Sequence, residues 1–149
     1  MINVDKIRIT ARCIIISKDS ILVQVSKKGD RYRLPGGRIK IDETALQTLE
    51  RELREELGLD LVEAKGPVYI VEAFYKTRRG LVHEIGLYFI CETTGTPEPK
   101  ESHLKVKWLP LSQLDEDRLR PKRLATLLKN LDKTLREQQN VIYVVSIDS

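Results

Sequence analysis

The sequence predicts an α/β fold in which a mixed β-sheet is flanked by helices. Segments rich in β-branched residues alternate with two segments of helical periodicity, in the order strands, helix, strands, helix. The chain has 149 residues, of which 41% are hydrophobic and 32% charged, as in an ordinary globular protein. This length suits one hydrophobic core, so we expect a single domain over residues 1–149.

The N-terminal third predicts a β-hairpin followed by a glycine turn. Residues 7–17 and 21–26 are rich in Ile and Val, and a Lys-Asp-Ser turn lies between them. The polar loop KKGDRYR follows, and then LPGG. This tetrapeptide should end any regular element, because proline pushes the residue before it toward extended geometry and glycine permits backbone shapes that other residues avoid.

Residues 43–57 carry the first helical pattern. Asp42 is available as the N-cap, and Gly58 suits the C-terminal stop. The apolar positions fall at spacings of three and four and so form one stripe, made of Leu46, Leu49, Leu53 and Leu57.

The second half of the chain predicts five further elements. They are strands at 68–75, 81–91, 106–109 and 141–147, and an amphipathic helix at 118–138. Residues 93–102 contain one glycine and two prolines and should form a loop.

Composition narrows the function classes. Cys13 and Cys91 each lie inside an apolar run, so we expect buried thiols, not a disulfide framework or a zinc site. The net charge of +4 suits anionic ligands without indicating general nucleic-acid binding. No apolar run is long enough to cross a bilayer, and the N-terminal MINVDKIRIT does not resemble a signal peptide. We therefore expect a cytoplasmic protein that has no membrane partner.

The first helix concentrates negative charge on one flank. At about 100° per residue, Glu52, Glu55 and Glu56 share that flank, and Glu56 lies beside the leucine stripe. Two carboxylates about 6 Å apart next to a packed face would repel by roughly 3 kcal/mol at an effective dielectric near 20. A divalent cation would relieve this, since Mg²⁺ prefers carboxylate oxygens. The alternative is a solvated face with ion pairs such as Glu50 with Arg54.

The segment GRIKIDETALQTLERELREELGL, residues 37–59, strengthens the metal hypothesis. Its glycine is followed after five residues by Glu43, after seven more by Arg51-Glu52-Leu53, and then by Glu55-Glu56 and Gly58-Leu59. This resembles the Nudix box at every defined position, and the LPGG before it matches the family's usual approach. So many specified positions rarely coincide by chance. The resemblance is strong over residues 32 to 59 and implies a Nudix-type α/β/α sandwich.

What the resemblance implies is a Nudix hydrolase. Such an enzyme is a pyrophosphohydrolase that cleaves a diphosphate linkage in a nucleoside diphosphate derivative or related nucleotide, using Mg²⁺ or Mn²⁺. The matching metal ligands are Glu52 and Glu56, with Glu55 as a further or water-bridged ligand and the main-chain carbonyl of Gly37 as an additional oxygen. Glu43 and Arg51 match the family's structural ion pair. Such chemistry needs cations that neutralise phosphoryl oxygens and align a water.

In many members of this family the general base is a glutamate from a loop beyond the box. Here that loop is TTGTPEPKESHLKVKW. We prefer Glu101 over Glu98, because Glu101 lies closer to the strand that leads to Trp108, and Glu52 remains a rival. The expected catalytic residues are thus Glu52, Glu55 and Glu101. An exposed acidic loop is the alternative reading of this segment.

Basic residues around the glycine turn could attract a polyphosphate. They are Lys27, Lys28, Arg31, Arg33, Arg38 and Lys40. We expect Arg33 and Arg38 to bind substrate, although basic loops also serve solubility. His83 fits a structural hydrogen-bonding role better than a catalytic one. Tyr75, Tyr88 and Phe89 could stack on a nucleobase, although strand aromatics more often pack in cores.

The leading hypothesis is therefore a hydrolase that acts on a small nucleotide-type substrate. One alternative is a non-catalytic Nudix domain that senses a nucleotide, which the intact glutamates oppose. Another is an RNA-end pyrophosphohydrolase, suggested by the basic loop and RLRPKRLATLLKNLDK. The leucine periodicity of that segment favours a packed helix, so nucleic acid is not the expected partner. The run VIYVVSI could be an edge strand that pairs in a homodimer.

Overall fold

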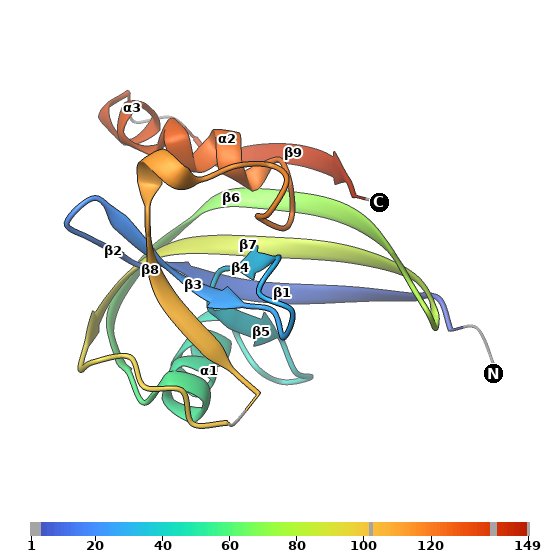
Figure 1. Ribbon diagram of the computed structural model, residues 1–149, viewed down its shortest axis with the longest axis horizontal. Helices are drawn as coiled ribbons and strands as arrows, with labels where there is room; N and C mark the ends of the chain where they lie inside the picture. The colour runs from blue at the N-terminus through green and yellow to red at the C-terminus, as the bar shows by residue number, and fades with distance from the viewer. Residues whose placement is uncertain (1–3, 102, 138–139, 149) are drawn as a thin grey trace.

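The computed structural model describes residues 4–101, 103–137 and 140–148. Its larger sheet has five strands in the order β5-β1-β7-β6-β9 (Figure 1). The pairs β1–β7 and β6–β9 are parallel and the other two are antiparallel, so the sheet is mixed as predicted. The strands are β1 (Lys6–Ile14), β5 (Gly36–Arg38), β6 (Asp60–Thr77), β7 (Gly80–Thr94) and β9 (Ile142–Ile147).

A smaller sheet is built around β3. Its members are β2 (Ile16–Ser17), β3 (Ser20–Val25), β4 (Tyr32–Arg33) and β8 (Lys105–Pro110), all antiparallel to β3. The sequence predicted one strand over residues 7–17, but the chain changes sheets after Ile14. The prediction was wrong there because the apolar run continues through Ile15, which is itself buried and gives no sign of the break.

The first helix follows the glycine turn. It comprises α1 (Ala45–Glu52) and a π-helical turn, η1 (Leu53–Leu57). Thr44, not the predicted Asp42, is the N-cap, since its hydroxyl accepts from the Gln47 N–H in a capping box. Gly58 ends the helix with φ of 67°, a left-handed conformation that suits glycine.

The helix predicted over 118–138 is wrong in its first residues and in its continuity, and its last residue, 138, lies outside the described residues. The structure has α2 (Leu124–Lys129) and α3 (Leu131–Arg136), which follow the short 3₁₀ turn η2 (Leu111–Gln113). Pro121 cannot continue a helix, because it lacks an N–H and disfavours helical geometry in the residue before it. Residues 118–120 bond instead to Tyr32, whose N–H donates to the Arg118 carbonyl and whose carbonyl accepts from the Arg120 N–H.

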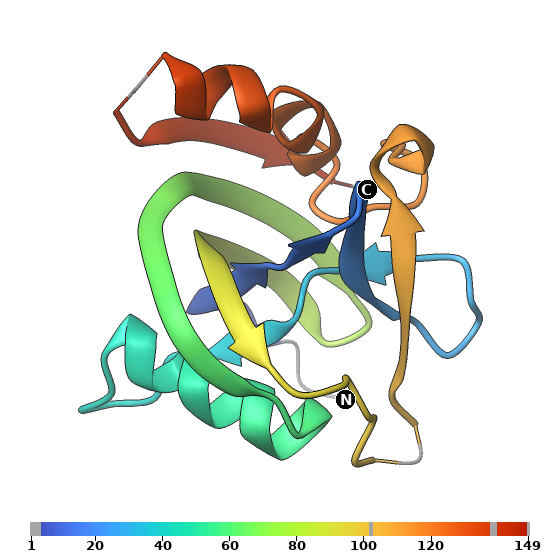
Figure 2. The same ribbon diagram turned by 90° about the vertical axis from the view of Figure 1, so that its left-hand side faces the viewer.

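Helices cover both faces of the larger sheet. Leucines of α1 and η1 pack on one side, in a core with Ala11 and Cys13. Leucines of α2 and α3 pack on the other side, in a core with Tyr69 and Tyr88. Figures 1 and 2 show α1 and the α2–α3 pair on opposite sides of the strands. This arrangement confirms the predicted α/β sandwich.

Strand β6 is much longer than the strand predicted at residues 68–75. It begins at Asp60 and passes through register shifts around Gly66 and Pro67.

Cys13 and Cys91 are buried free thiols, as expected, with their sulfur atoms 3.0 Å apart. In the described part of the chain, no helix is both long and apolar enough to cross a membrane.

Candidate active site

An ion pair joins the loop after β5 to α1. The Arg51 guanidinium donates from Nε to Glu43 Oε2 at 2.7 Å and from Nη2 to Glu43 Oε1 at 2.9 Å. Thr48 adds a hydroxyl donor to the same carboxylate. These contacts, first those from Arg51, hold the pKa of Glu43 well below its usual range. Glu43 and Arg51, the ion pair that the resemblance to the Nudix box implies, are therefore in contact. They fix the loop against the helix.

Glu52 lies directly against the glycine turn. A Cβ atom on Gly37 would come within 2.4 Å of Glu52 Oε1, so any side chain here would make the carboxylate move from this position. Arg51 Nη1 also donates to Glu52 Oε1 at 2.9 Å. One carboxylate of the acidic flank is thereby held beside the backbone of β5.

Glu56 is the second carboxylate of this cluster. Gln24 of β3 donates from Nε2 to Glu56 Oε2 at 2.5 Å. Burial raises the pKa of Glu56 to about 8, and its hydrogen bond and repulsion with Glu52 contribute, while Gln24 and Arg12 oppose the rise. Glu52 and Glu56 are therefore close enough to share a proton in the absence of a cation.

Glu55 does not join this pair. Its side chain is 62% exposed and lies 3.7 Å from Arg51. The π-helical turn explains the difference, because i→i+5 hydrogen bonding advances the chain by a smaller angle per residue than the α-helical spacing assumed from the sequence. Glu56 thus stays near Glu52 while Glu55 rotates toward solvent.

The donor set suits a hard divalent cation. Glu52, Glu56 and the Gly37 carbonyl offer oxygen atoms only, which favours Mg²⁺ or Mn²⁺ over softer metals. The half-buried carboxylate pair has an unfavourable mutual charge that a cation would offset. Within the described residues, no three His, Cys, Asp or Glu side chains form a ready cluster, so waters or substrate phosphates would complete the coordination.

The loop after β7 docks on the end of this helix. Lys100 N–H donates to the Glu56 carbonyl at 2.8 Å, and Glu98 N–H donates to the Leu57 carbonyl at 2.9 Å. Glu101 follows directly, and its carboxylate lies 3.0 Å from His103 Nε2, with about half of the side chain exposed. The loop is therefore attached to the helix that carries Glu52 and Glu56, while the Glu98 side chain points into solvent.

A basic pocket lies on the other side of Gln24. Its volume is about 360 Å³. The lining residues are Gln24, Val25, Ser26, Lys27, Arg31, Arg33, His103, Leu104 and Arg120. Because Gln24 contacts both the pocket and Glu56, the pocket adjoins the acidic pair. Its lining contains four cationic side chains and no carboxylate, which suits an anionic ligand.

The two predicted substrate arginines differ in position. Arg33 of β4 lines the basic pocket, and desolvation of its guanidinium, followed by the charge of Arg12, lowers its pKa. Arg38 lies on β5 with an exposed side chain, and its carbonyl accepts from Arg51 Nη2 at 3.2 Å. Arg33 therefore lies in the pocket, and Arg38 lies at the glycine turn.

Sequence reasoning missed two polar residues that connect these parts. Arg12 of β1 is only 7% exposed and donates to the Leu34 carbonyl at 3.0 Å, while its charge acts on both Glu56 and Arg33. Gln24 was not singled out either. The available signal was a polar residue in the middle of an apolar strand, as in ARCIII and ILVQV.

A buried polar group lies deeper on the same sheet face as Arg12. Glu84 of β7 is 2% exposed and accepts from Arg8 Nε at 2.9 Å and from the Tyr75 hydroxyl at 3.4 Å. Nearby, the Thr10 and Tyr88 hydroxyls are buried and have no hydrogen-bond partner among the described residues. Polar donors and acceptors thus continue from the acidic pair into the sheet.

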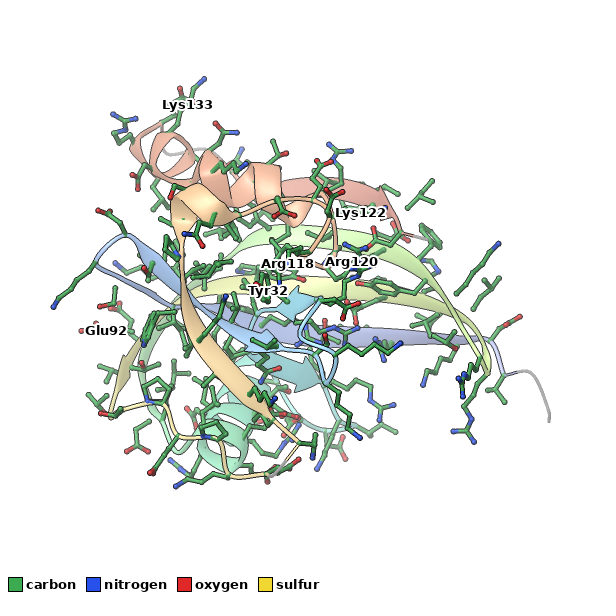
Figure 3. All side chains as sticks on the ribbon, viewed as in Figure 1. Tyr32, Glu92, Arg118, Arg120, Lys122 and Lys133 are labelled. Atoms are coloured by element: carbon green, nitrogen blue, oxygen red, sulfur yellow. The ribbon has the colours of Figure 1, made fainter. Side chains whose placement is uncertain are left out.

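Tyr32 pairs with residues 118–120, of which Arg120 lines the pocket. Figure 3 labels Tyr32, Arg118 and Arg120, which lie next to one another in the middle of the molecule. The Arg118 guanidinium lies over the Tyr32 ring, 4.5 Å from its centroid, and Lys107 lies 4.9 Å from the same centroid. Arg120 donates to the Glu116, Asp117 and Leu119 carbonyls. Much of the basic charge here is already engaged within the protein.

The chain is similar to known proteins of one family. A model of the NUDIX domain matches residues 6–131. The 8-oxo-dGTP diphosphatase of Buchnera aphidicola subsp. Schizaphis graminum is 32% identical over 107 residues, covering 68% of this chain and 75% of that protein. The 8-oxo-dGDP phosphatase NUDT18 of Danio rerio is 27% identical over 153 residues, covering 93% of this chain but 41% of that protein.

Solved structures share the fold. A MutT NUDIX hydrolase from Burkholderia pseudomallei aligns with a TM-score of 0.70 and 22% identity, covering 83% of this chain and 97% of that one. A MutT protein from Bacillus halodurans aligns with a TM-score of 0.71 and 16% identity, covering 95% of this chain and 90% of that one. At these identities the similarity concerns the fold alone.

The raised pKa of Glu56 predicts how stability should depend on pH without metal. Between the unfolded value of 4.5 and the folded value of about 8, the folded chain binds the extra proton. The free energy of unfolding in EDTA should therefore fall as pH rises through this window, by about 1 kcal/mol after allowance for solvent screening. Chemical denaturation at several pH values would measure it. Glu56→Gln should lose this component, and an equal fall in both proteins would contradict the assignment.

Proposed function

Because the chain belongs to the NUDIX family, we propose that it is a divalent-metal-dependent hydrolase that cleaves a diphosphate linkage in a nucleotide. Family membership confirms the resemblance seen in residues 37–59 and agrees with the predicted enzyme class, a Nudix-type pyrophosphohydrolase. The observation that carries the proposal is the carboxylate pair Glu52–Glu56 beside the Gly37 carbonyl.

Mg²⁺ or Mn²⁺ is the proposed cofactor. Glu52, Glu56 and the Gly37 carbonyl would hold it, and Glu55 would contact it through water because its side chain is exposed. When bound, the cation supplies charge neutralisation of phosphoryl oxygens and lowers the pKa of a coordinated water. Arg51 holds Glu52 in place, and Gln24 holds Glu56, so both ligands are positioned before any substrate arrives.

The proposed substrate is a nucleoside di- or triphosphate or a derivative of one. Its phosphates would bridge the acidic pair and the basic pocket, where Arg33 is the proposed contact. Arg38 is a second proposed contact at the glycine turn. The two curated relatives are named for oxidised guanine nucleotides, which makes these the first compounds to examine.

Glu101 is the proposed general base. The proposal is supported by the attachment of its loop, whose Lys100 and Glu98 N–H groups donate to the Glu56 and Leu57 carbonyls directly before Glu101. His103 contacts its carboxylate and could orient it. Glu52 is the rival, because it lies closest to the glycine turn.

The RNA-end alternative receives less support than small nucleotides. The basic segment from Arg118 to Arg123 is not an exposed helical face. Arg118 packs over Tyr32, and Arg120 donates to neighbouring carbonyls. Neither guanidinium is thus free to follow a phosphate backbone. A cytoplasmic location completes the proposal, and the free buried thiols agree with a reducing compartment.

Removing either charge of the carboxylate pair should abolish turnover. Glu52→Gln and Glu56→Gln are each expected to lower kcat by about 10² to 10³-fold, because the transition state loses electrostatic stabilisation. Steady-state assays with Mg²⁺ would measure this, with circular dichroism to verify folding. Glu98→Gln, an exposed change in the docking loop, is the matched control. Full activity in either pair variant would refute the proposal.

The two candidate bases can be separated by pH–rate profiles. If Glu101 accepts the proton, Glu101→Gln should remove the acidic limb of the kcat profile while leaving Mn²⁺ affinity unchanged. The same change should leave KM nearly constant. Loss of Mn²⁺ affinity without a changed profile would instead indicate a structural role in the loop and favour Glu52.

A substrate panel tests both the reaction and its alternatives. Oxidised and normal nucleoside triphosphates, nucleotide sugars and dinucleotides would be incubated in H₂¹⁸O, with products identified by mass. We expect ¹⁸O in one phosphate product and no reaction in EDTA. Tight binding by calorimetry without product over hours would support a sensor. Cleavage of a triphosphorylated oligonucleotide far above every free nucleotide would support RNA-end processing.

A further inference from the structure

The face of the larger sheet opposite α2 and α3 presents three cross-strand rows of side chains. The strand register aligns one residue from each of β1, β7, β6 and β9 in every row. The rows are Ile7-His83-Phe74-Ile147, Ile9-Ile85-Glu72-Val145 and Ala11-Leu87-Ile70-Tyr143. We call these residues the outer face. Ten of them are apolar or aromatic in this register, and only His83 and Glu72 are not.

The outer face is covered at one end only. Helix α1 and η1 pack near Ala11, and the strands β1, β6 and β7 run on past α1 to the right in Figure 1. Beyond α1 the side chains are open, with Ile7 69%, Tyr143 57% and Ile147 81% exposed. A hollow of about 380 Å³ lies between Ile7 and Phe74 at this end. Large contiguous apolar surfaces of this kind mark interaction sites.

The carboxylate within the outer face has partners on the same face. Glu72 contacts His83 Nε2 with one carboxylate oxygen and accepts from the Tyr143 hydroxyl with the other. The His83 ring also packs on Phe74, with ring centroids 4.4 Å apart. Both carboxylate oxygens therefore have a partner on the same face, so covering this face would not leave them without a hydrogen bond.

The edge of the outer face has none of the features that normally prevent association. β9 pairs with β6 and is the last strand in the described sheet. Its sequence, IYVVSI, contains no charge and no proline. Edge strands of monomers are usually protected by lysine, proline or a bulge. Three alternate residues of β9 continue the apolar rows to this edge.

We propose that the outer face is the contact between two copies of this chain, stacked sheet against sheet about a twofold axis. The exposed fractions of its residues leave roughly 800 Å² in solvent per copy, which equals one partner's share of a standard interface. Two such sheets would pack about 10 Å apart with aligned strands. A twofold axis needs a surface that matches itself, and an apolar face meets this need without a specific pattern of charges.

Charge favours a second copy over a foreign partner. Ten of the twelve residues of the outer face are apolar or aromatic, so two copies meet there with few like charges in contact. Its one carboxylate, Glu72, already contacts His83 and Tyr143 within the same copy. A strongly charged protein or nucleic-acid partner would find little complementary charge there. The inference does not depend on the proposed hydrolysis.

Analytical ultracentrifugation over a range of protein concentrations tests the dimer. The unmodified chain should sediment as a reversible dimer at micromolar concentration. Ile7→Lys and Ile147→Lys place a like charge on both copies and should each weaken association at least tenfold. Both positions are highly exposed, so folding should be preserved, as circular dichroism would verify.

Leu135→Lys is the matched control. Leu135 is 47% exposed on α3, on the opposite side of the sheet. It should leave the dimer intact, which supports the proposal. A monomer at all concentrations would overturn it, as would a dimer unaffected by both outer-face changes or one lost only with Leu135→Lys. Retained hydrolysis in a monomeric variant would separate this result from the proposed function.

Discussion

The proximity of two half-buried carboxylates is the constraint around which this site is organised. Burial, followed by the hydrogen bond and the charge of Glu52, raises the pKa of Glu56 to about 8, so the ionised pair is unfavourable without a cation. The surrounding structure is arranged to maintain it. Arg51 fixes Glu52, Gln24 fixes Glu56, and Gly37 leaves the space that a side chain would fill. Such organised repulsion is expected where a cation completes the site.

Acidic and basic groups of the site meet at Gln24 of β3. Its side chain donates to Glu56 and also lines the basic pocket, and Arg33 of β4 is its partner in the strand register. The charge of Arg12 lowers the pKa of both Glu56 and Arg33. A phosphate chain could therefore meet a cation at one end and guanidinium groups at the other. The preorganised field, not any one residue, would position the anhydride for attack.

The sequence predicted the parts of this molecule that depend on local pattern. The spacing of the leucines predicted α1, and the apolar runs predicted β6, β7 and β9. These spacings are informative because they follow which residues are buried. The resemblance of residues 37–59 to a known motif selected the acidic residues and their ion pair. The features that the sequence did not predict depend on contacts between residues far apart in the chain. Residues 118–120 bond to Tyr32, and Gln24 reaches Glu56 from another sheet. The displacement of Glu55 arose from a π-helical turn that no spacing rule anticipates.

In the loop that docks on the helix end, prolines alternate with residues whose backbone N–H groups bond to the helix. Pro97 and Pro99 have no N–H, whereas Glu98 and Lys100, which follow each of them, donate theirs to the Leu57 and Glu56 carbonyls. Those carbonyls would otherwise lack an intrahelical partner. Anyone exchanging this loop to redesign selectivity must therefore keep a non-proline residue at 98 and at 100. Side chains there are replaceable, but the two amide hydrogens are not.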